Sequence, residues 1–396
     1  MENGEESVFV KVAYFHHSGD LYGSSKSLLY LLGELRKKEV DPLVILAEDG
    51  PFRQLLKEKG FAVELVEEIP VLRRKMLRST VALFSFFYGF TRALPRICRI
   101  LRDNKIELIH SNDLVVGLAP GMAAWALKIP HVWHVRSNLG EFRLFSFLMR
   151  RLVRSFSTAL IGVSQSVVRQ VGTGSSTGIR LVYNGLPPEI IGRRLPFDTS
   201  FRERYALAAD DIVICCVGRI NGWKGQNFLA RAVASIRDEL PDSVKLLLVG
   251  DPYPGSEFHQ SQLEELIQLL GIRERTTQIS FVTDVRSVYE AIDILVVPSV
   301  IPEPFGLVVV EGMTYGCPII AANHGGPSEI LQDQRTGLLY EPGDLAGLAA
   351  RIRQLVADKE LRLKLGANAV KFMEHSFSIT ETADRVYDTY RFCLNR

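Results

Sequence analysis

Apolar runs rich in β-branched residues alternate along the chain with stretches whose apolar positions recur every three or four residues. Such runs predict buried strands, and the three- to four-residue spacing predicts helices. The strands expected in the first half are 8–15, 43–47, 62–66, 108–110, 131–135, 159–163 and 181–183. The helices expected between them are 24–36, 52–59, 92–104, 115–127 and 142–155. This alternation is typical of a parallel sheet with helices on both faces.

A second alternation follows residues 184–197, which hold three prolines and two glycines and are expected to be an interdomain linker. The strands expected after it are 212–217, 244–249, 279–282, 294–298 and 318–321, and the helices are 225–237, 260–270, 285–291 and 306–315. The chain beyond residue 345 is expected to be helical. The sequence therefore predicts an α/β protein with two doubly wound, Rossmann-like domains that face a central cleft, where ligands of such sheets bind.

Composition supports this picture and removes others. The 396 residues are 47% hydrophobic and 23% charged, which suits large cores and excludes disordered, collagen-like and disulfide-scaffold proteins. Five cysteines without Cys-x-x-Cys spacing, and an acidic N-terminus unlike a signal peptide, indicate a reducing cytoplasm. The apolar segment 79–91 is shorter than the roughly 20 residues that a spanning helix needs.

One segment with candidate chemistry is 303–313, reading EPFGLVVVEGM, which leads from an expected strand into a helix beginning near Gly306. Free amides at a helix start suit an anion such as a diphosphate. The carboxylates of Glu303 and Glu311 suit hydroxyl groups on either side of it. The alternative is that Glu303 is a helix N-terminal charge and that Glu311 lies on a solvated helix face.

A second such segment is 218–225, reading GRINGWKG, which follows the expected strand 212–217 and precedes a helix. Its two cationic side chains, those of Arg219 and Lys224, follow the end of a buried strand, where they could bind a diphosphate. The alternative is a surface loop with two solvated cations. Glycines at both ends and the position after a buried strand favour phosphate binding, although the segment is not a Walker loop.

Together these motifs resemble the retaining GT-B glycosyltransferases of family 4, the glycosyl transferases group 1. The resemblance covers nearly the whole chain. Gly-Arg followed by Lys-Gly, the Glu-x7-Glu spacing, Asn184-Gly185 and the segment 325–330 all contribute to it. It implies the GT-B fold, with an N-terminal acceptor-side domain, 1–188, and a C-terminal nucleotide-sugar-binding domain, 189–377. A final helix, 378–396, would cross back and pack on the first domain.

The resemblance also implies a donor site in the second domain. The residues concerned there are Arg219, Lys224, Val282, Val285, Glu303, Phe305, Gly306, Leu307 and Glu311. Arg219 and Lys224 would hold the donor diphosphate and, with Glu303, count as catalytic. The backbone amides of Gly306 and Leu307 would assist them.

Glu311 would bind the ribose hydroxyls and Glu303 those of the transferred sugar, while the base would lie near residues 282–285. The chain departs from the family at Gly312, where alanine is usual, and slightly within 326–329. Neither departure removes a charged group.

In the first domain, Gly23 lies in a glycine-rich loop that resembles the family's acceptor-side loop and would let the backbone approach the donor. The alternative is a simple helix start with Ser24 as its cap. His134 occupies the place where the family has a catalytic histidine beside the reacting sugar, and the alternative is a strand histidine without that role. Arg136 and Ser137 follow as acceptor-side candidates.

By this resemblance the chain is a retaining, metal-independent glycosyltransferase of the hexosyltransferase type. The donor would be a nucleotide sugar, a UDP- or GDP-sugar, and the acceptor a glycan or a lipid-linked glycan in polysaccharide biosynthesis. No cofactor and no metal are expected, because Arg219, Lys224 and the helix start at Gly306 supply positive charge to the leaving diphosphate. The departing phosphate would take the acceptor's proton, so that configuration is retained.

Charge is divided unevenly between the halves. Residues 1–190 hold 25 Lys and Arg against 18 Asp and Glu, whereas 191–396 hold 22 against 27. Basic residues mixed with aromatic ones gather in 71–105 and 143–154, which suits adsorption to anionic lipid headgroups. The alternative is a core-facing aromatic stripe with solvated arginines. We expect a cytoplasmic protein in peripheral contact with the inner face of a membrane.

Other functions remain open at this stage. Sugar-nucleotide epimerases and phosphorylases share the two-domain architecture, and a phosphorylase would carry a pyridoxal phosphate lysine. A nucleic-acid-binding protein would use the arginines with aromatic stacking, but the chain has no recognisable nucleic-acid module, so we expect no nucleic-acid partner. A catalytically inactive scaffold is disfavoured because the charged residues of both motifs are intact.

Overall fold

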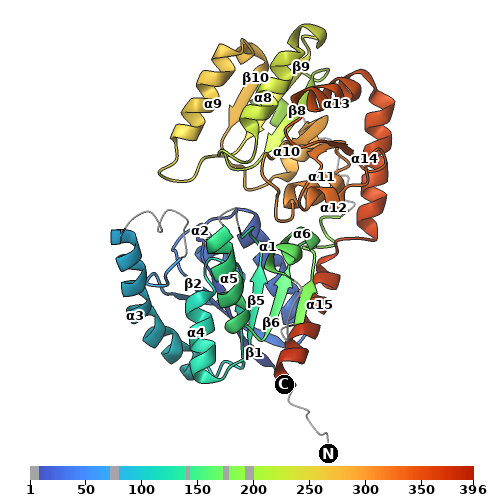
Figure 1. Ribbon diagram of the computed structural model, residues 1–396. Helices are drawn as coiled ribbons and strands as arrows, with labels where there is room; N and C mark the ends of the chain where they lie inside the picture. The colour runs from blue at the N-terminus through green and yellow to red at the C-terminus, as the bar shows by residue number, and fades with distance from the viewer. Residues whose placement is uncertain (1–8, 72–79, 140–142, 173–177, 192–199) are drawn as a thin grey trace, which may run out of the picture. The chain divides into compact units, whose positions relative to one another are not determined.

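The computed structural model describes residues 9–71, 80–139, 143–172, 178–191 and 200–396, without the side chains of 80–83 and 143–145. The chain folds into two compact units (Figure 1). Unit 1 comprises the chain up to Gly185 together with Ile379–Arg396, and unit 2 comprises Leu186–Ser378. The domain ends expected at 188 and 377 lie within three residues of these divisions.

Unit 1 is a parallel sheet covered by helices. Its described strands follow the order β3-β2-β1-β4-β5-β6-β7, and every pairing is parallel. The strands are β1 (Val10–His16), β2 (Val40–Leu46), β3 (Ala62–Leu65), β4 (Leu108–Ser111), β5 (His131–Val135), β6 (Ala159–Gly162) and β7 (Gly178–Leu181). The helices are α1 (Gly23–Arg36), α2 (Pro51–Glu58), α3 (Thr80–Asp103), α4 (Leu118–Leu127), α5 (Arg143–Ser155), α6 (Gln165–Val171) and α15 (Ile379–Leu394).

Unit 2 is a second parallel sheet, with the strand order β10-β9-β8-β11-β12-β13 among its described residues. The strands are β8 (Ile212–Val217), β9 (Val244–Val249), β10 (Thr276–Ile279), β11 (Ile294–Val297), β12 (Ile319–Ala322) and β13 (Leu338–Tyr340). The α-helices are α7 (Ser200–Arg204), α8 (Gln226–Ser235), α9 (Phe258–Leu269), α10 (Arg286–Ala291), α11 (Leu307–Thr314), α12 (Pro327–Ile330), α13 (Leu345–Ala357) and α14 (Lys359–Glu374). Two 3-10 turns are η2 (Arg237–Glu239) and η3 (Arg273–Arg275).

In both sheets the direction of winding reverses beside the first strand. The reversal lies between β1 and β4 in unit 1 and between β8 and β11 in unit 2. Ligands of open α/β sheets bind outside the carboxyl ends of the strands at such a reversal. The loops that follow these four strands are therefore where each unit is expected to place its functional side chains.

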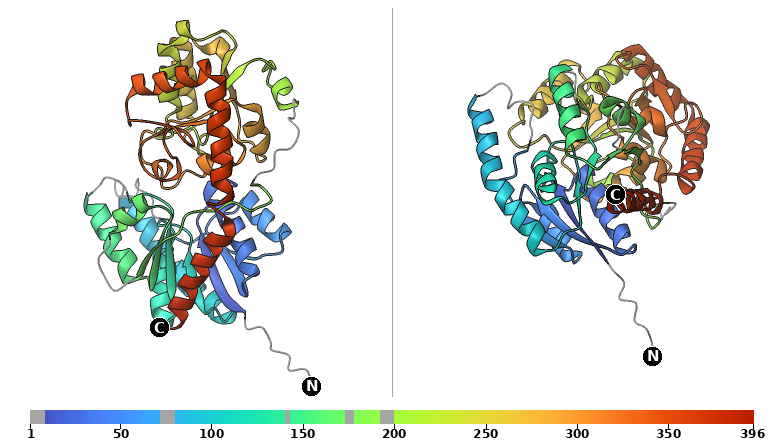
Figure 2. Two further views of the ribbon diagram at one scale, coloured as in Figure 1. Left: turned by 90° about the vertical axis from the view of Figure 1, so that its right-hand side faces the viewer. Right: turned by 60° about the horizontal axis from the view of Figure 1, so that its bottom comes forward.

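The C-terminal helix α15 belongs to unit 1 and runs alongside its sheet (Figure 2). Ile379, Ala383, Val386 and Tyr390 follow one another at four-, three- and four-residue spacing, which places them on one face of the helix. All four are buried in the core that β1, β2 and α1 build. The last helix of the chain thus completes the hydrophobic core of the first unit.

Several elements differ from the sequence-based expectations. Helix α3 begins at Thr80 rather than 92, because the apolar segment 80–91 continues the same helix, which also contains Pro95. Strand β10 ends at Ile279 instead of starting there, since the amide of Phe281 donates to the Asp251 carboxylate and leaves the ladder. The short elements α6, α12 and β13 were not expected at all.

Among the described residues, none of the helices combines the length and the apolar character that a membrane span requires.

Candidate active site

The two segments singled out in unit 2 meet at the reversal of its sheet. Residues 218–225 follow β8, and residues 298–306 follow the neighbouring strand β11. The parallel pairing of β8 with β11 puts both carboxyl ends at the same edge. The sequence placed these segments at strand ends, and the structure shows that the two strands are neighbours.

Two glycines shape the loop after β8. Gly218 has a φ of 150° and Gly225 a φ of 80°, conformations that side chains disfavour. A Cβ on Gly225 would overlap the carbonyl oxygen of Pro298, so the two loops approach each other closely here. Between the glycines, the Asn221 side chain accepts hydrogen bonds from the amides of Trp223 and Lys224, at 3.1 and 2.9 Å. The loop is therefore held in one conformation by its own residues.

Lys224 and Glu303 form a buried ion pair. The Lys224 Nζ lies 2.8 Å from the Glu303 Oε1, and the side chains are 17% and 6% exposed. The Ser299 hydroxyl donates to the same carboxylate oxygen at 2.5 Å. The interpretation of Glu303 as a simple helix N-terminal charge is therefore wrong, because one of its carboxylate oxygens, Oε1, bonds to both Lys224 and Ser299.

Arg219 is almost fully buried and its guanidinium lies over the ring of Tyr253, 4.0 Å from the ring centroid. Its carbonyl accepts a hydrogen bond from the Gln226 side chain at 2.9 Å, at the start of α8. Tyr253 is 48% exposed, so its ring and the Arg219 guanidinium together form part of the surface at the carboxyl end of β8. Sequence reasoning found Arg219 but not Tyr253.

Glu311 lies inside α11 and is 6% exposed, which excludes the solvated helix face. The Tyr289 hydroxyl of α10 donates to the Glu311 Oε2 at 2.9 Å. Burial, followed by the nearby Glu311 charge, raises the pKa of Tyr289 well above its ordinary value. Tyr289 therefore stays a neutral donor that orients the carboxylate.

Helix α11 starts at Leu307 with Gly306 at its N-cap, where φ is 102° and no side chain supplies a cap. The uncapped start leaves amides free for an anion. A backbone bridge pairs Glu303 with Gly325, and a Cβ on Gly326 would overlap the backbone of Phe305. Residues 325–327, which read Gly-Gly-Pro, thus pack directly against the loop that carries Glu303.

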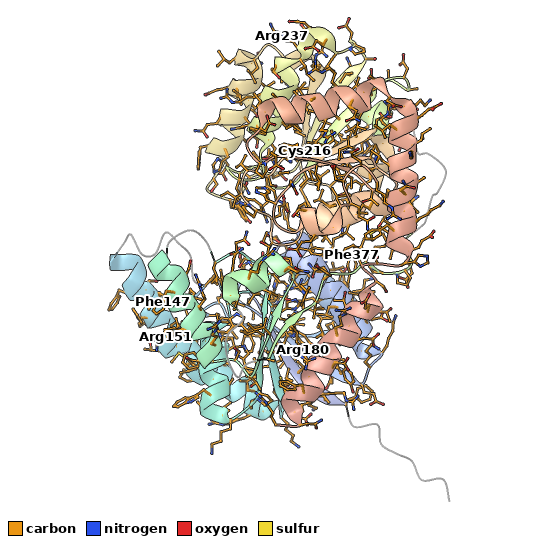
Figure 3. The ribbon with its side chains drawn as sticks, turned by 45° about the vertical axis from the view of Figure 1, so that its right-hand side comes forward. Phe147, Arg151, Arg180, Cys216, Arg237 and Phe377 are labelled. Atoms are coloured by element: carbon orange, nitrogen blue, oxygen red, sulfur yellow. The ribbon has the colours of Figure 1, made fainter. Side chains whose placement is uncertain are left out.

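The remaining donor-side candidates are placed less centrally. The ring of Phe305 is buried and packs edge-on against Phe377, which Figure 3 labels. Val282 and Val285 are half-buried in the turn between β10 and α10, with Val285 at the N-cap of α10. Nothing in the fold assigns them a contact with a base.

In unit 1 the predicted residues lie at the carboxyl ends of the central strands. Gly23 is exposed and is the first residue of α1, whose N-cap is Tyr22. The alternative with Ser24 as cap is wrong, because the Tyr22 carbonyl accepts the amide of Lys26 and the Asp20 carboxylate accepts that of Tyr22. A close approach between loops of the protein itself occurs at Gly19, where an added Cβ would lie 2.5 Å from the Asp49 carbonyl oxygen.

His134 and Arg136 belong to a buried polar network. Arg136 Nε donates to the Asn112 side-chain oxygen at 2.7 Å, and its Nη1 donates to that of Asn184 at 2.6 Å. Its Nη2 lies 3.5 Å from His134 Nδ1. Burial lowers the pKa of Arg136 to about 10, and Asp113 opposes that effect. His131 lies outside this network, because its ring bonds to the Ser111 hydroxyl and to the Phe156 carbonyl.

Ser137 donates to the Asp113 Oδ1 at 2.7 Å, which ties the end of β5 to the end of β4. Nearby strand ends and α3 line a hollow of about 470 Å³. Its polar lining residues from the loops after β1, β2 and β3 are His17, Glu48, Glu67 and Glu68. The hollow lies wholly on unit 1, at the sheet edge where a ligand is expected.

Sequence reasoning missed the partners rather than the charged residues. Asn112, Asp113 and His16 follow or end expected strands, so their position was a usable signal. Tyr289 and Tyr390 carry no such signal, because each acts from a helix that is distant in the chain. Within the described parts of the chain, no group of three or more His, Cys, Asp and Glu is placed to hold a metal ion.

The comparisons with known proteins agree with this arrangement. The family model of the glycosyl transferases group 1 matches residues 197–372, and that of Glycosyltransferase Family 4 matches residues 22–190. A D-inositol 3-phosphate glycosyltransferase of Mycobacteroides abscessus is 36% identical over 321 residues, which cover 76% of this chain and 69% of that protein. The capsular polysaccharide biosynthesis glycosyltransferase CapM of Staphylococcus aureus is 27% identical, with 92% and 95% of the two chains covered.

Among solved structures, HepE from Anabaena, in complex with UDP and glucose, superposes with a TM-score of 0.83 at 23% identity. The match covers 97% of this chain and 100% of that one, which confirms two Rossmann-like domains in the GT-B fold. The chain therefore belongs to glycosyltransferase family 4, the glycosyl transferases group 1, and is a glycosyltransferase.

Proposed function

We propose that the protein is a retaining, metal-independent hexosyltransferase that moves a sugar from a nucleoside diphosphate sugar to a glycan or lipid-linked acceptor. The observation that carries the proposal is the grouping in unit 2 of Arg219 and Lys224, after β8, with the buried carboxylate of Glu303, after β11. Two cations and a carboxylate at one strand edge suit a diphosphate joined to a sugar.

The ion pair leaves both partners free for a ligand. An ammonium group has three hydrogens, so Lys224 can donate to Glu303 and still donate to a phosphate oxygen. Lys224 and Ser299 both bond to Glu303 Oε1, and no described residue bonds to Oε2. That oxygen can accept hydrogen bonds from hydroxyls of the transferred sugar. Glu311, oriented by Tyr289, would accept from the ribose hydroxyls in the same way.

The chemistry follows from where charge develops. Breaking the bond from the anomeric carbon to the diphosphate builds negative charge on the leaving group. Arg219, Lys224 and the uncapped start of α11 at Gly306 and Leu307 would stabilise that charge without a metal. The departing phosphate would take the proton of the acceptor hydroxyl, so that attack and departure share one face and configuration is retained.

The relatives support parts of this proposal. HepE was solved with UDP and glucose, which favours a UDP-sugar over a GDP-sugar as donor here. CapM acts in capsular polysaccharide biosynthesis, which favours a growing glycan as acceptor. The epimerase and phosphorylase alternatives have no counterpart in these names. The hollow on unit 1, with three carboxylates, suits the hydroxyls of a neutral sugar acceptor.

Isothermal titration of the full chain with UDP and UDP-glucose tests the donor site. Arg219→Ala is expected to weaken UDP binding by about 10- to 100-fold, because it removes a charge-assisted contact to the diphosphate. The matched control is Arg237→Ala. Arg237 is an exposed arginine of unit 2 that donates to the Leu270 carbonyl and pairs with Asp238, away from the proposed donor site. Equal UDP affinity in Arg219→Ala and the parent chain would contradict the proposed donor site.

We also propose that unit 1 contacts an anionic membrane surface through α3 and α5. Phe84, Phe87 and Tyr88 on α3 are 74%, 60% and 55% exposed, and Phe147 on α5 is 53% exposed. Phe147 and Arg151, both labelled in Figure 3, belong to α5. The Arg151 guanidinium carbon lies 5.8 Å from the centroid of the Phe147 ring. Exposed aromatic rings beside arginines suit the headgroup region of a bilayer.

The solvated-arginine alternative holds for part of this surface. Arg92 and Arg96 both pair with Glu68, and Phe86 is buried, so these residues serve the fold. The expected basic residues 73–75 and Arg78 lie outside the described residues. The exposed aromatic side chains, rather than the charge count, therefore carry the membrane proposal.

Co-sedimentation with vesicles of 30% phosphatidylserine at low salt tests it. The triple variant Phe84→Ser, Phe87→Ser and Phe147→Ser is expected to lower the bound fraction of protein several-fold, because each substitution removes a ring that would make apolar contact with the bilayer. The control is Phe258→Ser, a change on unit 2 at a residue equally exposed, at 53%. Absence of vesicle binding by the parent protein would rule out the membrane contact and leave the donor site untouched.

A further inference from the structure

Tyr253 lies on the loop that follows β9, and β9 is a parallel neighbour of β8. The loop after β9 therefore leaves the sheet at the same edge as the loop after β8. The amide of Ile220 donates to the Asp251 carbonyl at 3.1 Å. A Cβ on Gly250 would lie 2.3 Å from the Gly218 carbonyl oxygen. The two loops are therefore in direct contact within unit 2.

The backbone that presents the Tyr253 ring is restricted. Pro252 and Pro254 flank the residue, and a proline fixes its own φ and limits the residue before it. The Tyr253 carbonyl accepts the amide of Ser256 at 2.8 Å, which closes a turn. The Asp251 carboxylate accepts a backbone amide from the segment after β10 at 2.9 Å. The ring is thus attached to a loop that is held at both ends.

The Tyr253 ring lies against the guanidinium of Arg219. The guanidinium carbon is 4.0 Å from the ring centroid, and Arg219 is 8% exposed while Tyr253 is 48% exposed. The negative face of an aromatic ring attracts a cation at this distance. Because the guanidinium is a rigid fork of N–H donors, holding it against the ring restricts the directions in which those donors point.

The second cation of the loop is held differently. Lys224 Nζ lies 2.8 Å from the Glu303 Oε1 and 4.6 Å from the centroid of the Trp223 ring. Both rings of Lys224's neighbourhood and of Arg219's thus face a cation, but the Trp223 ring belongs to the preceding residue of the same loop. The Tyr253 ring reaches its cation from another loop, so its position depends on the fold of unit 2.

We propose that Tyr253 is a positioning residue that holds the Arg219 guanidinium in place before the diphosphate of the donor binds. Immobilising a flexible side chain is one of the costs of binding, and this cost is smaller when the side chain is already ordered. Arg219 contacts the phosphate, and Tyr253 acts through Arg219. The inference rests on the proposed function for the identity of the ligand.

The contact can be measured without any nucleotide. Proton–nitrogen correlation spectra of the full chain with ¹⁵N-labelled arginine report each Nε–H group, and Arg219→Ala identifies the Arg219 signal. We expect the Arg219 Nε–H proton to lie upfield in the parent chain, because the Tyr253 ring current shields it. The signal should move downfield in Tyr253→Leu and stay near its parental position in Tyr253→Phe. An Arg219 signal that is the same in Tyr253→Leu and the parent would overturn the proposal.

Titration with UDP measures the effect on binding. Tyr253→Leu is expected to weaken UDP binding by about three- to tenfold, the range that corresponds to ordering one long side chain. Tyr253→Phe should retain the parental affinity, since the ring face attracts the cation. The matched control is Phe258→Leu, which removes a ring that is 53% exposed and lies against His259. Parental UDP affinity in Tyr253→Leu would refute the role of Tyr253 and leave the donor site standing.

A double variant separates positioning from direct contact with the nucleotide. In the Arg219→Ala background, Tyr253→Leu should cause no further loss of UDP affinity, because the ring acts through the guanidinium. The same loss in both backgrounds would mean that the ring contacts the nucleotide itself, and the proposal would fail.

Kinetics with a nucleotide-sugar donor give a second readout. Tyr253→Leu should raise KM for the donor by about three- to tenfold and change kcat by less than about twofold, since the cost of ordering Arg219 is met on binding. A fall in kcat with an unchanged KM would contradict the positioning role. If the parent chain bound no nucleoside diphosphate, the proposed function would fail and the role of Tyr253 with it, whereas the Arg219 signal would still report the contact.

Discussion

Lys224→Ala is expected to lower the free energy of unfolding of unit 2 by about 3–5 kcal/mol and to abolish measurable sugar transfer. The reason is the position of Glu303, whose side chain is 6% exposed and would lose the ammonium group that lies 2.8 Å from its carboxylate. Ser299 alone would remain as a donor to that carboxylate. Native-state hydrogen exchange of the β8 and β11 amides measures the effect, because it reports unit 2 by itself.

Glu303→Gln is the informative control for this effect. The glutamine amide carries no charge, and Lys224 at 17% exposure can turn toward water, so the loss of stability should be smaller. The double variant Lys224→Met with Glu303→Gln should recover most of the stability lost in Lys224→Ala, since no buried charge is then unpaired. Equal destabilisation in the single and double variants would show that the cost lies in packing rather than in the buried charge.

The sequence was sufficient to locate the charged groups of the candidate site. Arg219, Lys224 and Glu303 follow apolar runs that could only be buried strands, and parallel strands put their carboxyl ends at one edge. The periodicity therefore predicted that these residues lie at the same edge of the sheet, and the structure adds that their strands, β8 and β11, are neighbours. The burial of Glu311 was not implied, because one carboxylate within an apolar helix is compatible with either face.

What the sequence could not supply is the partner of each charged group. Tyr289 meets Glu311 across 22 positions, and Tyr390 meets His110 across 280. Such contacts depend on how helices pack on the sheet, which hydrophobic spacing restricts to a face and not to a particular neighbour. The prediction that Phe281 and Val282 belong to a strand was wrong for a related reason. The Asp251 carboxylate accepts the amide of Phe281, so β10 ends before these residues.

The two units use the same strand reversal for different chemistry. In unit 2, the reversal between β8 and β11 carries full charges that are paired with each other. In unit 1, the reversal between β1 and β4 carries buried histidines and side-chain amides around one guanidinium. The two reversals therefore differ in the charge of the groups that they carry.

The glycine at the end of the loop after β8 controls how Lys224 is presented. Gly225→Ala is expected to destabilise unit 2 by about 3 kcal/mol or more. An alanine at a φ of 80° costs about 1–2 kcal/mol by itself, and its Cβ would also overlap the Pro298 carbonyl. The overlap must be relieved by moving the loop away from β11, which would also separate Lys224 from Glu303.

The matched control lies three residues earlier in the same loop. Gly222→Ala introduces the same methyl group, but its nearest neighbour would be a His259 ring carbon at the ordinary distance of 3.6 Å. We expect Gly222→Ala to change the stability of unit 2 by less than about 0.5 kcal/mol. Urea unfolding and UDP titration of both variants measure the difference. If Gly225→Ala kept parental stability and UDP affinity, the close approach of the two loops would not be what holds Lys224 against Glu303.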